Sequence, residues 1–137
     1  MLEKLSQEQK IDLAKLIMVM LDDWGVSHSD KLNLLAMPPE VKVRSLRRYY
    51  IDAPLPDTNE VFERIDHLMG IADALRTSFP LNHHMASFWL NKKNQRFNDQ
   101  TPLEFMLEGG INNVVAVRTH LDCGWDWNQD RLYSSSE

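Results

Sequence analysis

The sequence has very little cysteine and no long apolar run, and each scarcity limits what the protein can be. Cys123 is the single cysteine among 137 residues, so no disulfide can form within the chain. That composition fits a reducing compartment, and we expect a cytoplasmic protein. The longest apolar run, from Leu16 to Leu21, is far too short to cross a bilayer. The charged, periodic segment that follows Ser6 does not resemble a signal peptide.

Motifs typical of enzymes and of cofactor sites are also missing. The sequence contains no G-x-S-x-G, no phosphate-binding G-x-x-x-x-G-K-[ST], no G-x-G-x-x-G and no H-E-x-x-H. His83 and His84 are adjacent, and His120 and Cys123 form one H-x-x-C pair, but a zinc site needs four converging ligands. We therefore expect a non-catalytic protein that holds no metal and no cofactor.

Charge is distributed unevenly along the chain. The net charge is −5, but residues 1–50 carry +1 and residues 51–137 carry −6. An acidic segment repels the phosphates of nucleic acid. Any contact with DNA therefore belongs to the N-terminal half, and the acidic half is better suited to protein partners.

Helical periodicity runs through most of the chain. Ser6 and Gln9 form a capping box ahead of the first helix, and Gly25 follows its end. Its expected apolar stripe consists of Leu13, Leu16, Ile17, Met20, Leu21 and Trp24. Ser27, with Asp30 three residues later, caps a short second helix. The sequence thus predicts an all-α fold, a compact bundle of about six or seven short helices.

A third helix is expected from Pro39 to about Tyr50, because proline suits the first position of a helix. Together with the second helix it has the lengths of a helix-turn-helix, whose second helix reads the major groove. The candidate DNA-binding residues on it are Lys42, Arg44, Arg47 and Arg48. Glu40 would repel phosphate, so a degenerate motif that only packs or dimerises stays an alternative.

The segment from Asp52 to Asp57 contains Pro54 and Pro56 and is the clearest linker. We divide the chain there, into an N-terminal part of residues 1–52 and a C-terminal part of residues 57–137. Asp57 and Glu60 are expected to cap the next helix. Its apolar positions are Val61, Phe62, Ile65, Leu68, Met69, Ala72 and Leu75, and Gly70 among them indicates close approach by a neighbouring helix.

The C-terminal part contains several ordered start and stop signals. A short helix is expected over 82–90, with Met85, Phe88 and Trp89 facing inward, followed by a polar loop over 91–100. Thr101-Pro102-Leu103-Glu104 starts a helix that Gly109-Gly110 ends. The last helix runs to Leu121 with Ile111, Val114, Val117 and Leu121 inward.

The order of these features resembles the MbcA/ParS/Xre antitoxin family. The segment WLNKKNQRFNDQTPLEFMLEGGINNVVAVRTHL resembles its toxin-binding domain, and Trp24 to Met37 resembles the Xre-like segment that precedes it. The resemblance implies an antitoxin of a type II toxin–antitoxin module. It further implies a RES-domain, NAD-consuming toxin as partner, occlusion of that toxin, a homodimer and repression of the protein's own operon. Ala36 stands where the family usually has glycine.

The tail after Leu121 holds the other candidate contacts. Trp125 and Trp127 follow the last periodic residue, and indoles are enriched at interface hot spots. The candidate toxin-binding residues are Arg118, Asp122, Trp125, Asp126, Trp127 and Arg131. A tail that folds back on its own domain is the alternative for the two indoles. For the whole chain, the alternatives are a DNA-binding regulator whose C-terminal half only dimerises, and an adaptor within another assembly.

Overall fold

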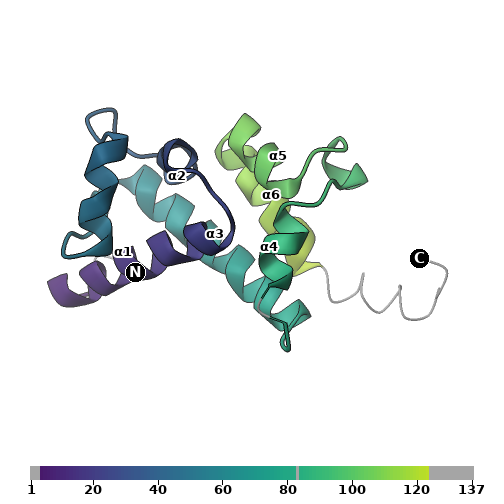
Figure 1. Ribbon diagram of the computed structural model, residues 1–137, viewed down its shortest axis with the longest axis horizontal. Coiled ribbons are helices and arrows are strands. Elements are labelled where there is room, and N and C mark those ends of the chain that lie inside the picture. Colours follow the sequence, from purple (N-terminus) through teal and green to yellow (C-terminus); the bar gives the residue numbers. More distant parts are fainter. Residues whose placement is uncertain (1–3, 83, 124–137) are drawn as a thin grey trace. The chain divides into compact units, whose positions relative to one another are not determined.

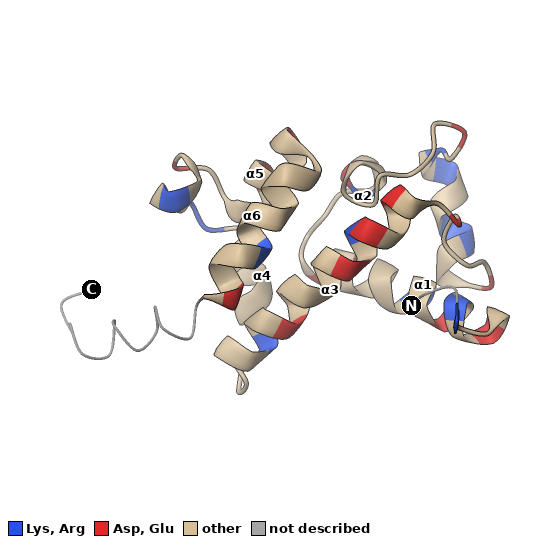
Figure 2. Cartoon of the chain, turned by 180° about the vertical axis from the view of Figure 1, so that it is seen from behind, with Lys and Arg blue, Asp and Glu red and all other residues tan. Residues whose placement is uncertain are grey.

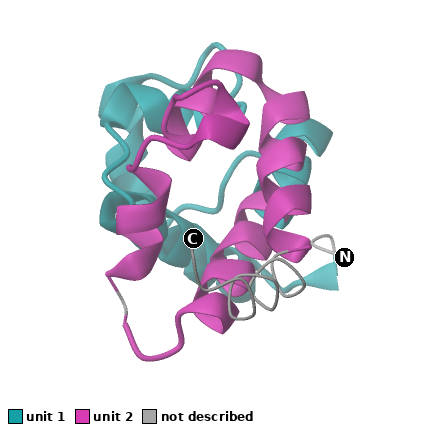
Figure 3. Cartoon of the chain, turned by 90° about the vertical axis from the view of Figure 1, so that its right-hand side faces the viewer, with its two compact units in different colours: residues 1–66 teal, residues 67–137 magenta. Residues whose placement is uncertain are grey.

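The computed structural model describes residues 4–82 and 84–123, and Figure 1 shows these residues as an assembly of helices. Six α-helices and two 3-10 helices are present in these ranges, and they contain no β-strand. The predicted all-α fold is therefore confirmed. The chain forms two compact units, residues 1–66 and residues 67–137, coloured separately in Figure 3. No helix within the described ranges is long and apolar enough to cross a membrane.

Helix α1, Gln7–Asp23, begins with the predicted capping box, because the Ser6 hydroxyl accepts from the Gln9 N–H. Its buried face is rotated relative to the predicted stripe. Ala14, Ile17, Met18 and Leu21 are buried there. Leu16 was predicted to face inward and is 56% exposed. Ile17, Leu21 and Trp24 are buried as predicted, but the prediction was wrong for Leu16. The apolar run from Leu16 to Leu21 covers more than one side of a helix, so periodicity alone does not select the face.

Helix α2, His28–Leu34, starts at Ser27, whose hydroxyl accepts from the Asp30 N–H at 3.2 Å as predicted. The chain turns at both ends of α2 through left-handed residues, Gly25 at φ 80° and Ala36 at φ 52°. A side chain in this backbone region costs about 1–2 kcal/mol. The guanidinium of Arg64 donates to the carbonyls of Asn33 and Leu34, at 3.1 and 3.0 Å, and so satisfies the end of α2.

The third helix differs from the prediction and does not confirm a helix-turn-helix. Residues 39–42 are not helical, and η2, Val43–Tyr50, is a 3-10 helix. The Val41 N–H bonds to the Pro38 carbonyl, which closes a turn, and Lys42 is extended at ψ 165°. Residues three positions apart in the chain lie on one side of a 3-10 helix. Leu46 and Tyr49 share such a side, and both are buried.

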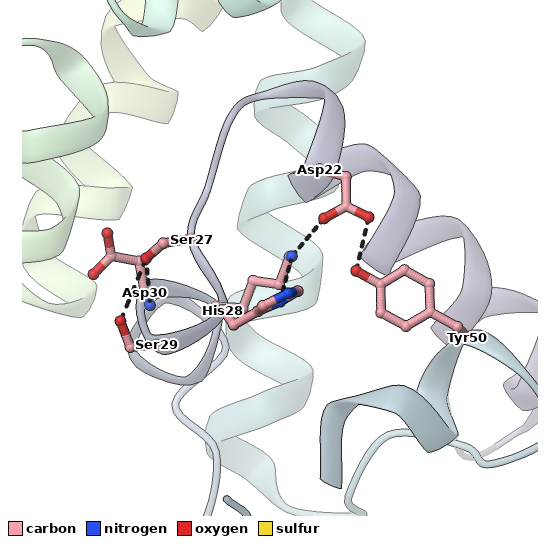
Figure 4. Close-up of polar contacts among 7 residues, drawn as sticks. Asp22, Ser27, His28, Ser29, Asp30 and Tyr50 are labelled. Atoms are coloured by element: carbon pink, nitrogen blue, oxygen red, sulfur yellow. Dashed lines mark hydrogen bonds and ion pairs between the residues drawn. The ribbon is translucent and has the colours of Figure 1, made fainter. Parts of the chain in front are cut away.

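A buried lysine ties together three elements of the first unit. Lys31 of α2 is 1% exposed and pairs with Asp22 of α1. Tyr50 of η2 donates to the second oxygen of Asp22 at 2.7 Å, and Lys31 Nζ lies 3.3 Å from His28 Nδ1. Figure 4 shows Asp22 between these partners.

The pKa of Asp22 responds to this environment. Burial raises the pKa, but the hydrogen bonds from Lys31 and Tyr50 outweigh it and hold the pKa below its ordinary 3.8. Because the folded pKa is depressed, the contribution of Asp22 to stability is present above about pH 4 and is lost as the pH falls through the folded pKa.

Helix α3, Asn59–Ser78, follows the proline-containing segment. The Thr58 hydroxyl accepts from the Val61 N–H at 3.1 Å, so Thr58 caps the helix and the predicted Asp57–Glu60 pair was wrong. Val61, Ile65, Leu68, Ile71 and Leu75 are buried along it. The helix ends at Ser78, two residues before Pro80. The boundary between the two units lies inside α3, after Asp66.

The second unit continues with α4, Met85–Leu90, the 3-10 helix η3, Gln95–Phe97, α5, Pro102–Gly109, and α6, Ile111–Asp122. Helix α4 is shorter than predicted, because Asn82 and His84 lie outside it. Phe88 was predicted to face inward and is 56% exposed, whereas Leu90, two residues later, is fully buried. In so short a helix the buried face is set by neighbouring helices, and the sequence pattern does not specify them.

Helices α5 and α6 are the two helices that the sequence predicts on either side of Gly109-Gly110. Thr101 and Glu104 make a complete capping box, with both hydrogen bonds at 3.0 Å. Gly110, at φ 68°, ends α5 and opens α6. Across the turn, the Asn113 amide donates to the Phe105 carbonyl at 2.8 Å. Val114, Val117 and Leu121 are buried along α6.

Candidate functional site

The second unit is built around a cluster of aromatic rings from four of its elements. The Phe97 ring, 4% exposed, lies 6.2 Å from Trp89, 5.0 Å from Phe105 and 5.5 Å from His120, measured between centroids. Trp89 and His120 stack nearly parallel, at 14° and 6.2 Å. The cluster therefore joins α4, η3, α5 and α6 around Phe97, which the sequence placed only in a polar loop.

His120 is the titratable member of this cluster. Burial lowers the pKa of its imidazole, and the charge of Arg96 lowers it further. Both effects favour the neutral imidazole, since protonation would place a desolvated charge beside a nearby cation.

We expect acid to destabilise the second unit through His120. Because the folded pKa lies below the ordinary 6.5, the unfolded chain binds more protons as the pH falls through 6.5, and stability is lost in that direction. His120→Phe keeps an aromatic ring and removes the titration. Thermal melts at pH 7.5 and pH 5.5 should show the wild type losing a few degrees more than the variant. Equal losses in the two proteins would contradict this role.

A second group of contacts surrounds Arg118 on α6. One guanidinium nitrogen lies 3.1 Å from His67 Nδ1 on α3, and Nε lies 3.7 Å from Asp122. A Cβ built on Gly70 would lie 2.5 Å from the Arg118 Cζ atom, so the guanidinium occupies the space left by the missing side chain. The close approach predicted at Gly70 is present, and the side chain of Arg118 makes it. Arg118 thus links α6 to α3, while the Asp122 side chain is 59% exposed.

The other predicted contacts in the tail cannot be placed. Trp125, Asp126, Trp127 and Arg131 lie outside the described residues. Arg118 and Asp122, at the end of α6, are the members of that set with described positions. Among the described residues no group of three or more His, Cys, Asp or Glu could hold a metal ion.

The predicted DNA-binding cations all lie on or beside η2 in the first unit. Lys42, Arg44, Arg47 and Arg48 are exposed, and Figure 2 shows blue along this segment. Arg44 and Arg47 are three residues apart, so they fall on one row of the 3-10 helix, while Leu46 and Tyr49 lie on a second row and are buried. The structure therefore brings the four cations to one short element whose apolar side is buried.

Sequence patterns missed one exposed group in the second unit. Phe88 is exposed, with Lys92 Nζ 5.5 Å from its ring centroid, and Lys93 and Arg96 follow on the exposed connection into η3. A count of charges would have indicated this group, because no Asp or Glu occurs from residue 74 to residue 98.

Comparison with known proteins finds a family that matches part of the second unit. The family described as antitoxin Xre/MbcA/ParS C-terminal toxin-binding domain matches residues 74–122, the range that contains α4 to α6. The chain is 29% identical to the uncharacterized protein y4oB of Sinorhizobium fredii (strain NBRC 101917 / NGR234) over 101 residues, which are 74% of each chain. No solved structure matches the chain significantly. The resemblance carried by the C-terminal motifs is confirmed for residues 74–122, which match a toxin-binding family of antitoxins.

Proposed function

We propose that this protein is an antitoxin whose second unit binds a cognate toxin and occludes it. The observation that carries the proposal is the match of residues 74–122 to a toxin-binding domain. Its elements are held in place by the ring cluster around Phe97 and by the contacts of Arg118, so they offer a partner a preorganised platform. The resemblance of the sequence supports a RES-domain toxin that consumes NAD.

In this proposal, residues 122–131, which begin at the end of α6, are the occluding segment that covers the toxin. Arg118 and Asp122 set the polar register at the edge of the platform, and Asp126 and Arg131 continue it. Trp125 and Trp127 are the apolar anchors, since an indole buries about 150–250 Å² in an interface. The support for this assignment is the sequence pattern of residues 122–131 and the exposure of Asp122.

Co-expression with the protein encoded beside this chain tests the proposal. The partner alone should stop growth and lower cellular NAD, and the full chain should restore both. A chain that ends at Cys123 should keep its helical circular dichroism yet rescue cells poorly, because it lacks the occluding segment. Full rescue by that truncated chain would refute the occluding role, and absence of any complex with the full chain would refute the antitoxin.

A second candidate function, repression of the protein's own operon, is favoured by the four exposed cations on or beside η2. These cations could neutralise phosphates and give salt-dependent binding. A homodimer would present two such groups of cations, as paired half-sites on DNA require. A mobility shift with the promoter of the protein's own operon tests this function. Binding should weaken in Arg44→Ala/Arg47→Ala, and a shift indifferent to that variant, or no shift at low salt, would exclude it.

A further inference from the structure

The connection from α4 into η3 concentrates the positive charge of the second unit. Residues 67–123 contain five Lys or Arg, and three of them, Lys92, Lys93 and Arg96, fall within five residues. All three side chains are exposed. No carboxylate occurs from residue 74 to residue 98, while residues 99–137 carry a net charge of −5. Figure 2 shows blue on this connection between α4 and α5.

An exposed aromatic ring adjoins one of these cations, Lys92. Phe88 is 56% exposed, although Leu90 two residues later is fully buried, so α4 is anchored on one side and presents the ring on the other. Lys92 Nζ lies 5.5 Å from the ring centroid, which is within the range of a cation–π contact. Aromatic rings and arginine are enriched among interface hot spots. We call Phe88, Lys92, Lys93 and Arg96 the α4–η3 surface.

The backbone holds this surface in place. The Asn91 amide donates to the Ser87 carbonyl at 2.8 Å, and the Asn94 side chain accepts from the Arg96 N–H at 3.0 Å. Leu90 before the connection is fully buried and Phe97 after it is 4% exposed. The cations therefore stand on a short segment anchored at both ends, which lowers the entropic cost of binding.

We propose that the α4–η3 surface docks onto an acidic patch of the toxin, with Phe88 as the apolar centre and the three cations as its rim. This inference rests on the proposed function. The positive charge of this surface favours an acidic partner. Because the whole chain has a net charge of −5, an acidic partner is attracted to this basic patch and so approaches in one orientation. A protein partner is favoured over nucleic acid because the surface lies inside residues 74–122, which match a toxin-binding domain.

Binding kinetics of the full chain with the protein encoded beside it test the inference. Lys92→Glu/Lys93→Glu/Arg96→Glu should slow association about 10-fold or more and remove the decline of the association rate with salt. Phe88→Ala should weaken affinity about 10-fold, mainly through faster dissociation. Wild-type kinetics in both variants would overturn the docking surface.

Matched variants on the first unit are the controls. Lys4→Glu/Lys10→Glu/Lys15→Glu makes the same change in net charge, and Leu16→Ala removes an apolar side chain that is also 56% exposed. Both should bind as the wild type does, and losses equal to those of the α4–η3 variants would overturn the inference. A labelled DNA duplex whose binding is lost in the triple α4–η3 variant, while partner binding persists, would reassign the surface to nucleic acid. Failure of the wild type itself to bind the partner would instead refute the proposed function, and this inference with it.

Discussion

Phe97→Ala is expected to lower the free energy of unfolding of the second unit by about 3–5 kcal/mol, the usual range for removing a buried phenyl ring. Phe97 is 4% exposed and its ring contacts Trp89, Phe105 and His120. The loss is a large fraction of the roughly 5–15 kcal/mol that stabilises a typical domain. We therefore expect partial unfolding near 37 °C and loss of the proposed toxin neutralisation. Urea denaturation followed by circular dichroism measures the first effect, and growth rescue measures the second.

The chain provides its own control for this prediction. Phe88→Ala is the same chemical change at a residue that is 56% exposed, so it should change the free energy of unfolding by less than about 1 kcal/mol. If Phe97→Ala were as harmless as Phe88→Ala, the ring cluster would not hold the second unit together. If both were equally destabilising, the exposed position of Phe88 would be wrong.

Asp22→Ala is expected to destabilise the first unit by about 3 kcal/mol, because it leaves the ammonium of Lys31 buried without its carboxylate. Lys31 is 1% exposed, so water cannot replace the lost partner. Tyr50 loses its acceptor in the same variant. The midpoint of urea denaturation should fall without a change in the m-value, since the same surface is exposed on unfolding.

Removing the other partner should cost much less. In Lys31→Met the remaining carboxylate of Asp22 is 43% exposed and can be hydrated, while methionine fills the volume of the lysine stem. We expect this variant to lie within about 1 kcal/mol of the wild type, and Asp22→Ala/Lys31→Met to recover most of the loss. Equal damage in the two single variants would mean that the ion pair itself, rather than the burial of one charge, supplies the stability.

Local chemistry allowed most element boundaries to be predicted. Ser6 with Gln9, Ser27 with Asp30 and Thr101 with Glu104 cap helices as expected, because a cap depends on residues three apart in the chain. Gly110 ends α5 for a similarly local reason. The sequence also indicated the antitoxin family, since the order of its C-terminal motifs survives without knowledge of the packing.

Packing against distant residues decided what local patterns left open. Leu16 and Phe88 are exposed and Lys31 is buried, although hydrophobicity alone favours the reverse in all three cases. The helix expected from Pro39 became a turn followed by a 3-10 helix that buries Leu46 and Tyr49. Asp22 pairs with the buried Lys31 and accepts a hydrogen bond from Tyr50, although Tyr50 lies 28 positions further along the chain.

The sequence by itself thus determined the helical class, the caps of α1, α2 and α5, and the family that residues 74–122 match. Only the tertiary structure decided which side chains of these helices face solvent. It also placed Phe97, which the sequence had assigned to a polar loop, at the centre of the ring cluster. The physical reason is that hydrogen-bonded caps and turns involve residues close in the chain, whereas burial depends on elements that meet only after folding.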